Sequence, residues 1–344
     1  MLKKKNKTAG IAGAGLLGRL LALKLQQSHW KVSLFDQDDM NGTLSCGLSA
    51  AGMLAPMSEL ESSDTSIYEL GLRSLTLWPT IIKHLPHPVY FQQAGSLITA
   101  HPQDRNELHR YSQLIASKLS QKTHEILDEK AVQTLEPELK NISEGIYFPI
   151  EGQIANQELM KALAITLTRT DVQWFPKTKV THVDPRVIYF ENGKQTFDMV
   201  FDCRGLGAKS TFSDLRGIRG ELIELHAPAV NITRPVRLLH PRYRLYIVPR
   251  PHHHYVIGSS EIESEDSSNI SVRSTLEFLT AAYSLHTGFA EARIIKTTVN
   301  CRPTFPDHLP RIKQEAGLIA INGLYRHGLL IAPALLEKAE VFYA

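Results

Sequence analysis

The 344-residue sequence predicts an α/β fold in which a discontinuous domain, built on a parallel β-α-β unit, is interleaved with an α+β domain that carries an antiparallel sheet. Three observations support this prediction. A strand, a helix and a strand follow one another at the N-terminus, residues 219–260 are rich in strand and turn signals, and a buried strand, 317–321, recurs near the C-terminus. Strands that alternate with helices form parallel sheets, whereas strands joined by turns form antiparallel ones.

The N-terminal unit is the clearest element. Residues 8–12 predict a short buried strand, and residues 16–27 carry apolar side chains at helical spacing. Residues 32–35 predict a second strand that ends at Asp36. Residues 66–85 then predict a helix with an apolar face that is interrupted near Pro79.

The middle of the chain mixes helices and strands. Residues 89–100 predict two short strands around a turn at Gly95, and residues 103–135 predict helix. Residues 156–169 predict an amphipathic helix with Asn156 as its N-cap. Further strands are expected at 172–175, 179–183, 187–190, 197–202, 244–249 and 254–259. We expect His252–His254 to form a solvated hairpin tip, because adjacent histidines point to different sides and chelate a metal poorly.

Composition and charge exclude several kinds of protein. The net charge of +3 is too small for a dedicated nucleic-acid binder. No run of about 20 uninterrupted apolar residues predicts a membrane span. The three cysteines, Cys46, Cys203 and Cys301, have no metal-ligand spacing and fit a reducing, cytoplasmic location. Arg19 and Lys24 interrupt the first apolar stretch, which argues against a signal peptide.

A glycine motif lies between the first strand and the first helix. Gly13, Gly15 and Gly18 form G-x-G-x-x-G, and Asp36 ends the next strand. The glycines allow a tight turn, a close approach of the backbone to a pyrophosphate and close helix–strand packing, while the acidic residue accepts hydrogen bonds from ribose hydroxyls. The context therefore predicts a Rossmann-type dinucleotide site, and the motif alone leaves FAD and NAD open.

Further stretches carry a family resemblance. The small-residue segment 45–56 would allow the chain to pass close to a flat isoalloxazine ring. With the glycine motif, it resembles the D-amino-acid oxidase superfamily of FAD-dependent oxidoreductases, and the glycine oxidase branch of the thiamine pathway in particular. The other similar stretches, in the expected order over nearly the whole chain, are 94–102, 145–153, 201–208, 219–225, 245–250, 302–310 and 323–334.

The resemblance implies roles for individual residues. Arg302 and Tyr246 would hold the substrate carboxylate and Arg326 would line the site, so these three are the candidate catalytic residues. The candidate FAD-binding residues, with FAD expected to be non-covalent, are Gly13, Gly15, Leu16, Leu17, Gly18, Asp36, Ser45, Ala50, Ala51, Gly52, Met53, Val180, Cys203, Gly205, Gly207, Arg302, Tyr325, Arg326, Gly328 and Leu329.

The resemblance also implies the domain organisation. An FAD-binding Rossmann-type domain would comprise 1–80, 145–218 and 316–344, and an α+β antiparallel-sheet substrate domain would comprise 81–144 and 219–315. The implied activity is oxidation of glycine or another small amine or D-amino acid, with hydride transfer to flavin and oxygen as acceptor. The product imine would supply thiazole synthesis for thiamine. Whether the protein forms a homo-oligomer is left open.

Departures from the family pattern leave two alternatives. Leu335 and Leu336 replace the usual Thr-Gly pair near the expected start of the last helix, by Pro333, where they would crowd the flavin. A flavin-binding protein without turnover is therefore one alternative. The other is an oxidase of a modified tRNA base, because the DHLP stretch at 307–310 also resembles the oxidase domain of the bifunctional tRNA wobble-uridine-modifying enzyme. Sarcosine oxidases of the superfamily attach flavin through a cysteine, so Cys301 is a candidate for a covalent link, although a buried free thiol is the usual role.

Overall fold

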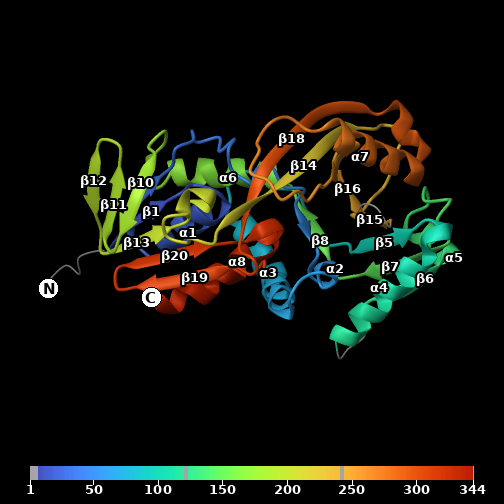
Figure 1. Cartoon of the computed structure of the whole chain (residues 1–344), viewed down its shortest axis with the longest axis horizontal. Coiled ribbons are helices and arrows are strands. Elements are labelled where there is room, and N and C mark those ends of the chain that lie inside the picture. The colour runs from blue at the N-terminus through green and yellow to red at the C-terminus, as the bar shows by residue number, and fades with distance from the viewer. Residues whose placement is uncertain (1–6, 120–122, 241–243, 344) are drawn as a thin grey trace.

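The computed structural model describes residues 7–119, 123–240 and 244–343. Within them, two large sheets lie beside each other along the long axis of the molecule (Figure 1). Segments from the beginning, middle and end of the chain meet in the first sheet, as the different colours of its strands show (Figure 1). This arrangement confirms the predicted α/β fold with two kinds of sheet.

The first sheet is of the Rossmann type. Among the described residues it has six strands in the order β19-β20-β13-β1-β2-β9, parallel except for β19, which is antiparallel to β20. Its strands are β1 (Thr8–Ala12), β2 (Lys31–Phe35), β9 (Gln173–Phe175), β13 (Met199–Asp202), β19 (Arg311–Glu315) and β20 (Leu318–Asn322). The carboxyl ends of its parallel strands therefore meet at one edge, where ligands bind in such sheets.

Helices cover one face of this sheet and a small sheet covers the other. One core cluster joins its strands to α1 (Leu16–Gln27), α3 (Thr65–Lys83), α6 (Asn156–Thr168) and α8 (Gly328–Ala339). The opposite face packs on an antiparallel sheet through a second cluster that includes Phe35 and Phe197. This covering sheet consists of β10 (Val180–Asp184), β11 (Val187–Phe190) and β12 (Gly193–Thr196).

The second large sheet is mostly antiparallel. Within the described part of the chain, its order is β18-β14-β17-β16-β15-β5-β7-β6, and β15 and β5 are its parallel pair. The strands are β5 (Ser96–Ala100), β6 (Glu125–Asp128), β7 (Glu144–Phe148), β14 (Arg216–His226), β15 (Val236–Leu239), β16 (Arg244–Arg250), β17 (His254–Gly258) and β18 (Arg293–Thr304). The helices α4 (Arg105–Lys118), α5 (Glu129–Leu135) and α7 (Val272–Leu285) pack on it.

A small sheet consists of β3 (Met53–Leu54), β8 (Gly152–Ile154) and β4 (Phe91–Gln92). Its strand β8 lies between the large sheets, near the short helix α2 (Pro56–Glu59) (Figure 1). Single turns of 3-10 helix occupy Pro102–Asp104, Gly205–Ala208, Thr287–Glu291, Tyr325–His327 and Glu340–Phe342. No helix in the described ranges is long and apolar enough to cross a membrane.

Several predicted elements need correction. The stretch 103–135 is not all helix, because β6 lies between α4 and α5 and pairs with β7. The strand β12 was not predicted. Helix α3 runs through Pro79 without interruption. The N-cap of α6 is Ala155 rather than Asn156, whose side-chain amide instead donates to the carbonyl oxygens of Gly47 and Leu48 at 3.0 and 2.8 Å.

The last helix begins earlier than predicted. Helix α8 starts at Gly328, so Pro333 lies inside it. Leu335 and Leu336 are more than a turn beyond the helix N-terminus and are buried in the core shared by α1 and α3. The expectation that they crowd the flavin is therefore wrong, because their side chains fill the helix–helix core.

Sheet membership departs most from the predicted domain boundaries at β7 and β19. Most of β7 falls within the segment assigned to the FAD-binding domain, but it pairs with β5 and β6 in the antiparallel sheet. Strand β19 falls within the predicted substrate domain, but it pairs with β20 in the Rossmann-type sheet. The hydrogen-bonding partners of a strand lie far away in sequence, so its own pattern does not reveal which sheet it joins.

Candidate active site

A single cavity of about 490 Å³ runs from the carboxyl edge of the Rossmann-type sheet to the inner face of the antiparallel sheet. It begins beside Gly13 and Asp36 and reaches Tyr246 and Arg302. Of the residues predicted from the sequence to form the site, only Gly18 and Val180 are absent from its lining. Its volume lies within the usual range of small-molecule and cofactor sites.

Gly18 and Val180 make packing contacts outside the cavity. A Cβ on Gly18 would lie 1.9 Å from the carbonyl oxygen of Gly13, so Gly18 allows the first helical turn to pack on the preceding strand. The side chain of Val180, on β10, packs against the cluster around Phe35 on the other face of the sheet. The side chain of Val180 therefore covers the sheet rather than lining the cavity, and its part in FAD binding stays a prediction.

The turn between β1 and α1 has the geometry that the glycine motif requires. Gly13 has a φ of +98°, and its Cβ would lie 2.5 Å from the carbonyl oxygen of Cys203. The Asp36 carboxylate accepts hydrogen bonds from the backbone N–H groups of Ala14 and of Asp38, the latter at 2.8 Å. The N-terminus of α1 thus opens into the cavity beside an acidic side chain, which fits a pyrophosphate and a ribose.

A buried arginine supports this turn. The guanidinium of Arg19 donates to the carbonyl oxygens of Ala14, Met160 and Met40 at 2.7, 2.8 and 3.0 Å. Burial lowers the pKa of Arg19 to about 10. In the sequence Arg19 only interrupts an apolar run, so this role could not be read from the pattern.

The small-residue segment that was expected to face the flavin is fixed by long-range contacts. Gly52 has a φ of +77°, and its Cβ would lie 2.0 Å from the carbonyl oxygen of Ile154. Arg250 donates to the carbonyl oxygens of Ala51 and Ile154, at 2.5 and 3.1 Å, and to the Gln153 amide oxygen at 2.6 Å. The sequence prediction missed Arg250, which holds the cavity wall in place from the end of β16.

All three cysteines are free and line the cavity. The thiol of Cys301 lies 3.6 Å from the carbonyl oxygen of Asp266, and the thiol of Cys46 donates to the carbonyl oxygen of Cys301 at 3.2 Å. Burial raises the pKa of Cys46 to about 11. This thiol is therefore protonated and unreactive at neutral pH.

Arg302 and Tyr246 lie at the far end of the cavity. Arg302 donates to the carbonyl oxygen of Ser260 at 3.0 Å and to the Ser259 hydroxyl at 2.8 Å. A Cβ on Gly220 would lie 2.2 Å from the guanidinium, so glycine leaves room for it. Burial raises the pKa of Tyr246, whose hydroxyl therefore stays protonated and able to donate. These hydrogen-bond partners of Arg302 are neutral, which leaves its charge available for an anion.

Arg326, unlike Arg302, is in contact with carboxylates. Its guanidinium contacts the Glu59 carboxylate at 2.7 Å, the Glu261 carboxylate at 2.5 Å and the Ser62 hydroxyl. Burial alone would raise the pKa of Glu59, but the neighbouring positive charges, that of Arg326 first among them, together outweigh burial and lower this pKa to about 2. Arg326 lines the cavity as predicted, but two carboxylates neutralise it. The sequence analysis did not single out either glutamate, because each lies in an irregular segment without a motif.

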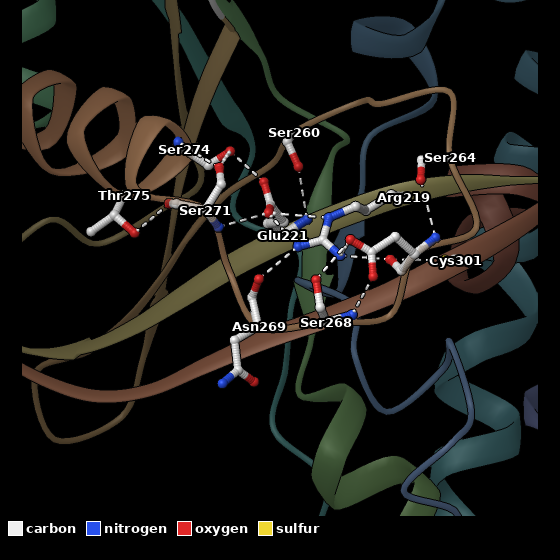
Figure 2. A network of polar contacts seen from close by, with 11 residues as sticks. Arg219, Glu221, Ser260, Ser264, Ser268, Asn269, Ser271, Ser274, Thr275 and Cys301 are labelled. Carbon is white, nitrogen blue, oxygen red and sulfur yellow. Dashed lines mark hydrogen bonds and ion pairs between the residues drawn. The ribbon is translucent and has the colours of Figure 1, made fainter.

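The segment 259–271, here called the strap, connects β17 to α7 and carries Ser259, Ser260 and Glu261 into contact with both arginines. A buried ion pair between Arg219 and Glu221, at 2.8 Å, anchors it (Figure 2). Arg219 donates to the carbonyl oxygens of Asp266 and Asn269, at 2.6 and 2.8 Å. Glu221 accepts from the backbone N–H of Ser271 and from the Ser274 hydroxyl.

Removing the carboxylate of this ion pair should destabilise the protein. Glu221→Ala leaves the charge of Arg219 buried without compensation, so we expect the free energy of unfolding to fall by about 3–5 kcal/mol. Glu263→Gln is the matched control, because Glu263 lies on the same strap and pairs with Arg216 at the surface. We expect its effect to stay below about 1 kcal/mol. Denaturant unfolding measures both, and equal effects would contradict the assigned difference.

Comparisons with known proteins agree with this geometry. The model of the FAD-dependent oxidoreductase (DAO) family matches residues 9–336. A protein of Rhizobium etli named as a thiamine biosynthesis oxidoreductase, ThiO, is 35% identical over 332 residues, which cover 94% of this chain and 93% of the relative.

Solved structures show the same fold at lower identity. Glycine oxidase from Geobacillus kaustophilus has a TM-score of 0.85 at 21% identity, covering 97% of this chain and 94% of that one. Iminodiacetate oxidase from Chelativorans sp. BNC1 has a TM-score of 0.81 at 23% identity, covering 94% and 92%. The chain therefore belongs to the DAO family and is an FAD-dependent oxidoreductase.

Proposed function

We propose that the protein oxidises glycine or another small amine or D-amino acid, and that Arg302 and Tyr246 bind the substrate carboxylate. The observation that carries this proposal is the position of Arg302 at the end of the cavity opposite the glycine motif, with neutral hydrogen-bond partners. A guanidinium binds a carboxylate through two parallel hydrogen bonds, and the protonated hydroxyl of Tyr246 adds a third donor.

The structure fits FAD and suggests which residues would hold it. Gly13 and Gly15 would approach the pyrophosphate and Asp36 the ribose, while the wall around Ala51 and Gly52 and the N-terminus of α8 would line the flavin. When bound, FAD supplies the hydride acceptor and passes the electrons to oxygen.

The residues of the chain contribute positioning. Arg302 and Tyr246 would fix the carboxylate, and with it the α-carbon. The Glu59–Arg326–Glu261 cluster adds a net negative charge beside this clamp, which complements the positive amino group of a bound amino acid. Release of a proton from that group to solvent would give the neutral amine, whose lone pair would assist transfer of the hydride to FAD.

The two alternatives lose their motivation. Leu335 and Leu336 pack in the helix–helix core, so no crowding of the flavin speaks for a protein without turnover. The DHLP stretch packs behind the site, where the His308 ring lies 4.6 Å from that of Tyr325.

The name of the Rhizobium relative supports a role in supplying the glycine imine for thiamine synthesis. We place the protein in the cytoplasm, where its cysteines stay reduced.

Anaerobic mixing tests the proposal. The purified protein with bound FAD should lose its flavin absorbance when mixed with glycine, sarcosine or D-alanine, because hydride transfer reduces the ring. Readmission of air should restore the absorbance and produce peroxide. Flavin that stays oxidised with all of these amines would refute amine oxidation, while the family membership would stand.

A further inference from the structure

A second arginine lines the substrate end of the cavity. Arg237, on β15, lies directly opposite Tyr246 on β16 in the antiparallel register, and both line the cavity. Directly opposed residues on neighbouring strands point to the same face, with Cβ atoms about 5 Å apart. The Arg237 side chain is only 9% exposed. Tyr246 therefore has Arg237 beside it on β15. The charge of Arg302, on β18, also acts on the Tyr246 hydroxyl.

Carboxylates act on Arg237 through their charge: burial alone would lower the pKa of its guanidinium, but neighbouring groups, Glu59 and Glu61 among them, raise this pKa. Its guanidinium donates to the carbonyl oxygen of Ser58 at 2.7 Å, the one hydrogen bond found for it among the described residues. The nearest carboxylate in an ion pair with it, that of Glu61, lies 3.9 Å away and is shared with Arg110 at 3.8 Å. Arg326, in contrast, has two carboxylates within 2.7 Å.

A buried guanidinium has five N–H donors and is costly to leave without acceptors. An anionic group of the substrate would supply these acceptors. Arg302 accounts for only one carboxylate. The opposite wall of the same end therefore has the charge and the donors for a second one.

We infer that Arg237 forms a second anion subsite, and that the preferred substrates are amines with two carboxylates. This inference rests on the proposed function and names its substrate class. One carboxylate binds Arg302 and Tyr246, next to the carbon that is oxidised, and the other binds Arg237. The second carboxylate is carried either on the amine nitrogen, as in an N-carboxymethyl amino acid, or on the side chain, as in an acidic D-amino acid.

Pairs of substrates that differ in one charge test the inference. We compare kcat/KM for iminodiacetate with that for its monoamide, and for D-aspartate with that for D-asparagine. A charge-assisted hydrogen bond is worth about 1.5–3 kcal/mol, so the acid should exceed its amide by roughly 10- to 150-fold in the pair whose geometry fits. The pair that shows the preference identifies where the second carboxylate is carried.

Variants of two arginines locate the preference. Arg237→Met should reduce the acid-to-amide ratio to within about threefold of one, because the fixed positive charge is gone. Arg237→Lys should retain part of it. Arg110→Met is the matched control, since it removes an exposed cation near Glu61 and should leave the ratio unchanged. As a readout without turnover, succinate should perturb the flavin spectrum at a lower concentration than butyrate does.

The outcomes separate this inference from the proposed function. Ratios near one in the unmodified protein, or a ratio that survives in Arg237→Met, would overturn the second subsite while glycine still reduces the flavin. If no amine reduces the flavin, with one carboxylate or two, the proposed function fails. Poor folding of Arg237→Met would not rescue the inference, because the ratios of the unmodified protein and the succinate titration already decide it.

Discussion

Replacing Arg302 by methionine is expected to raise the KM for glycine by roughly two to three orders of magnitude while FAD remains bound. The variant removes a bidentate contact to the substrate carboxylate, and two charge-assisted hydrogen bonds are worth about 3–5 kcal/mol together. The protein itself should lose little stability, because the groups left behind, the Ser260 carbonyl oxygen and the Ser259 hydroxyl, are neutral. Steady-state kinetics and the flavin spectrum of the variant measure the two effects separately.

Arg326→Met provides the contrast. That variant leaves the Glu59 and Glu261 carboxylates without their shared cation, so it should lower the free energy of unfolding as well as activity. A variant of Arg302 with an unchanged KM would remove this residue from carboxylate binding. A large loss of stability in Arg302→Met would equally contradict the assignment, because it would show that the guanidinium serves the fold rather than the ligand.

The sequence predicts the dinucleotide-binding part well because its constraints are local. The turn at Gly13, the packing of Gly18 and the position of Asp36 directly after β2 lie within one β-α-β unit, and each needs a particular residue type. Strand β6 was missed for the opposite reason. It lies at a sheet edge, and the side chain of Ile126 is 64% exposed to solvent. Its apolar residues do not alternate clearly, so only its pairing with β7 defines it as a strand.

The substrate end could be predicted only in part. Arg302 and Tyr246 were found through family resemblance, whereas Arg237 looks in sequence like one polar residue in an apolar strand. Its opposition to Tyr246 depends on the register of β15 and β16, and the pairing of Arg326 with Glu59 joins segments 267 residues apart. Such contacts arise from tertiary structure, and no local pattern encodes them.

Alanine substitutions at Gly15 and Gly18 should have opposite consequences, although the two glycines belong to one motif. A Cβ on Gly18 would meet the Gly13 carbonyl oxygen at 1.9 Å, and this backbone atom cannot move without disrupting the turn. We expect Gly18→Ala to lower the free energy of unfolding by about 3 kcal/mol or more. A Cβ on Gly15 would meet only the Ser45 hydroxyl, at 3.4 Å, and the backbone there is extended, with a φ of −68° and a ψ of −170°.

Gly15→Ala should therefore fold with a loss of only about 1 kcal/mol, because alanine is a slightly poorer N-cap than glycine. Its methyl group points into the cavity, where the backbone must approach the pyrophosphate, so the Kd for FAD should rise at least about tenfold. Thermal unfolding of the apoprotein and titration with FAD, followed by the quenching of flavin fluorescence, distinguish the two variants. Gly15→Ala that binds FAD normally, or Gly18→Ala as stable as the unmodified protein, would show that these glycines do not divide the roles of approach and packing in this way.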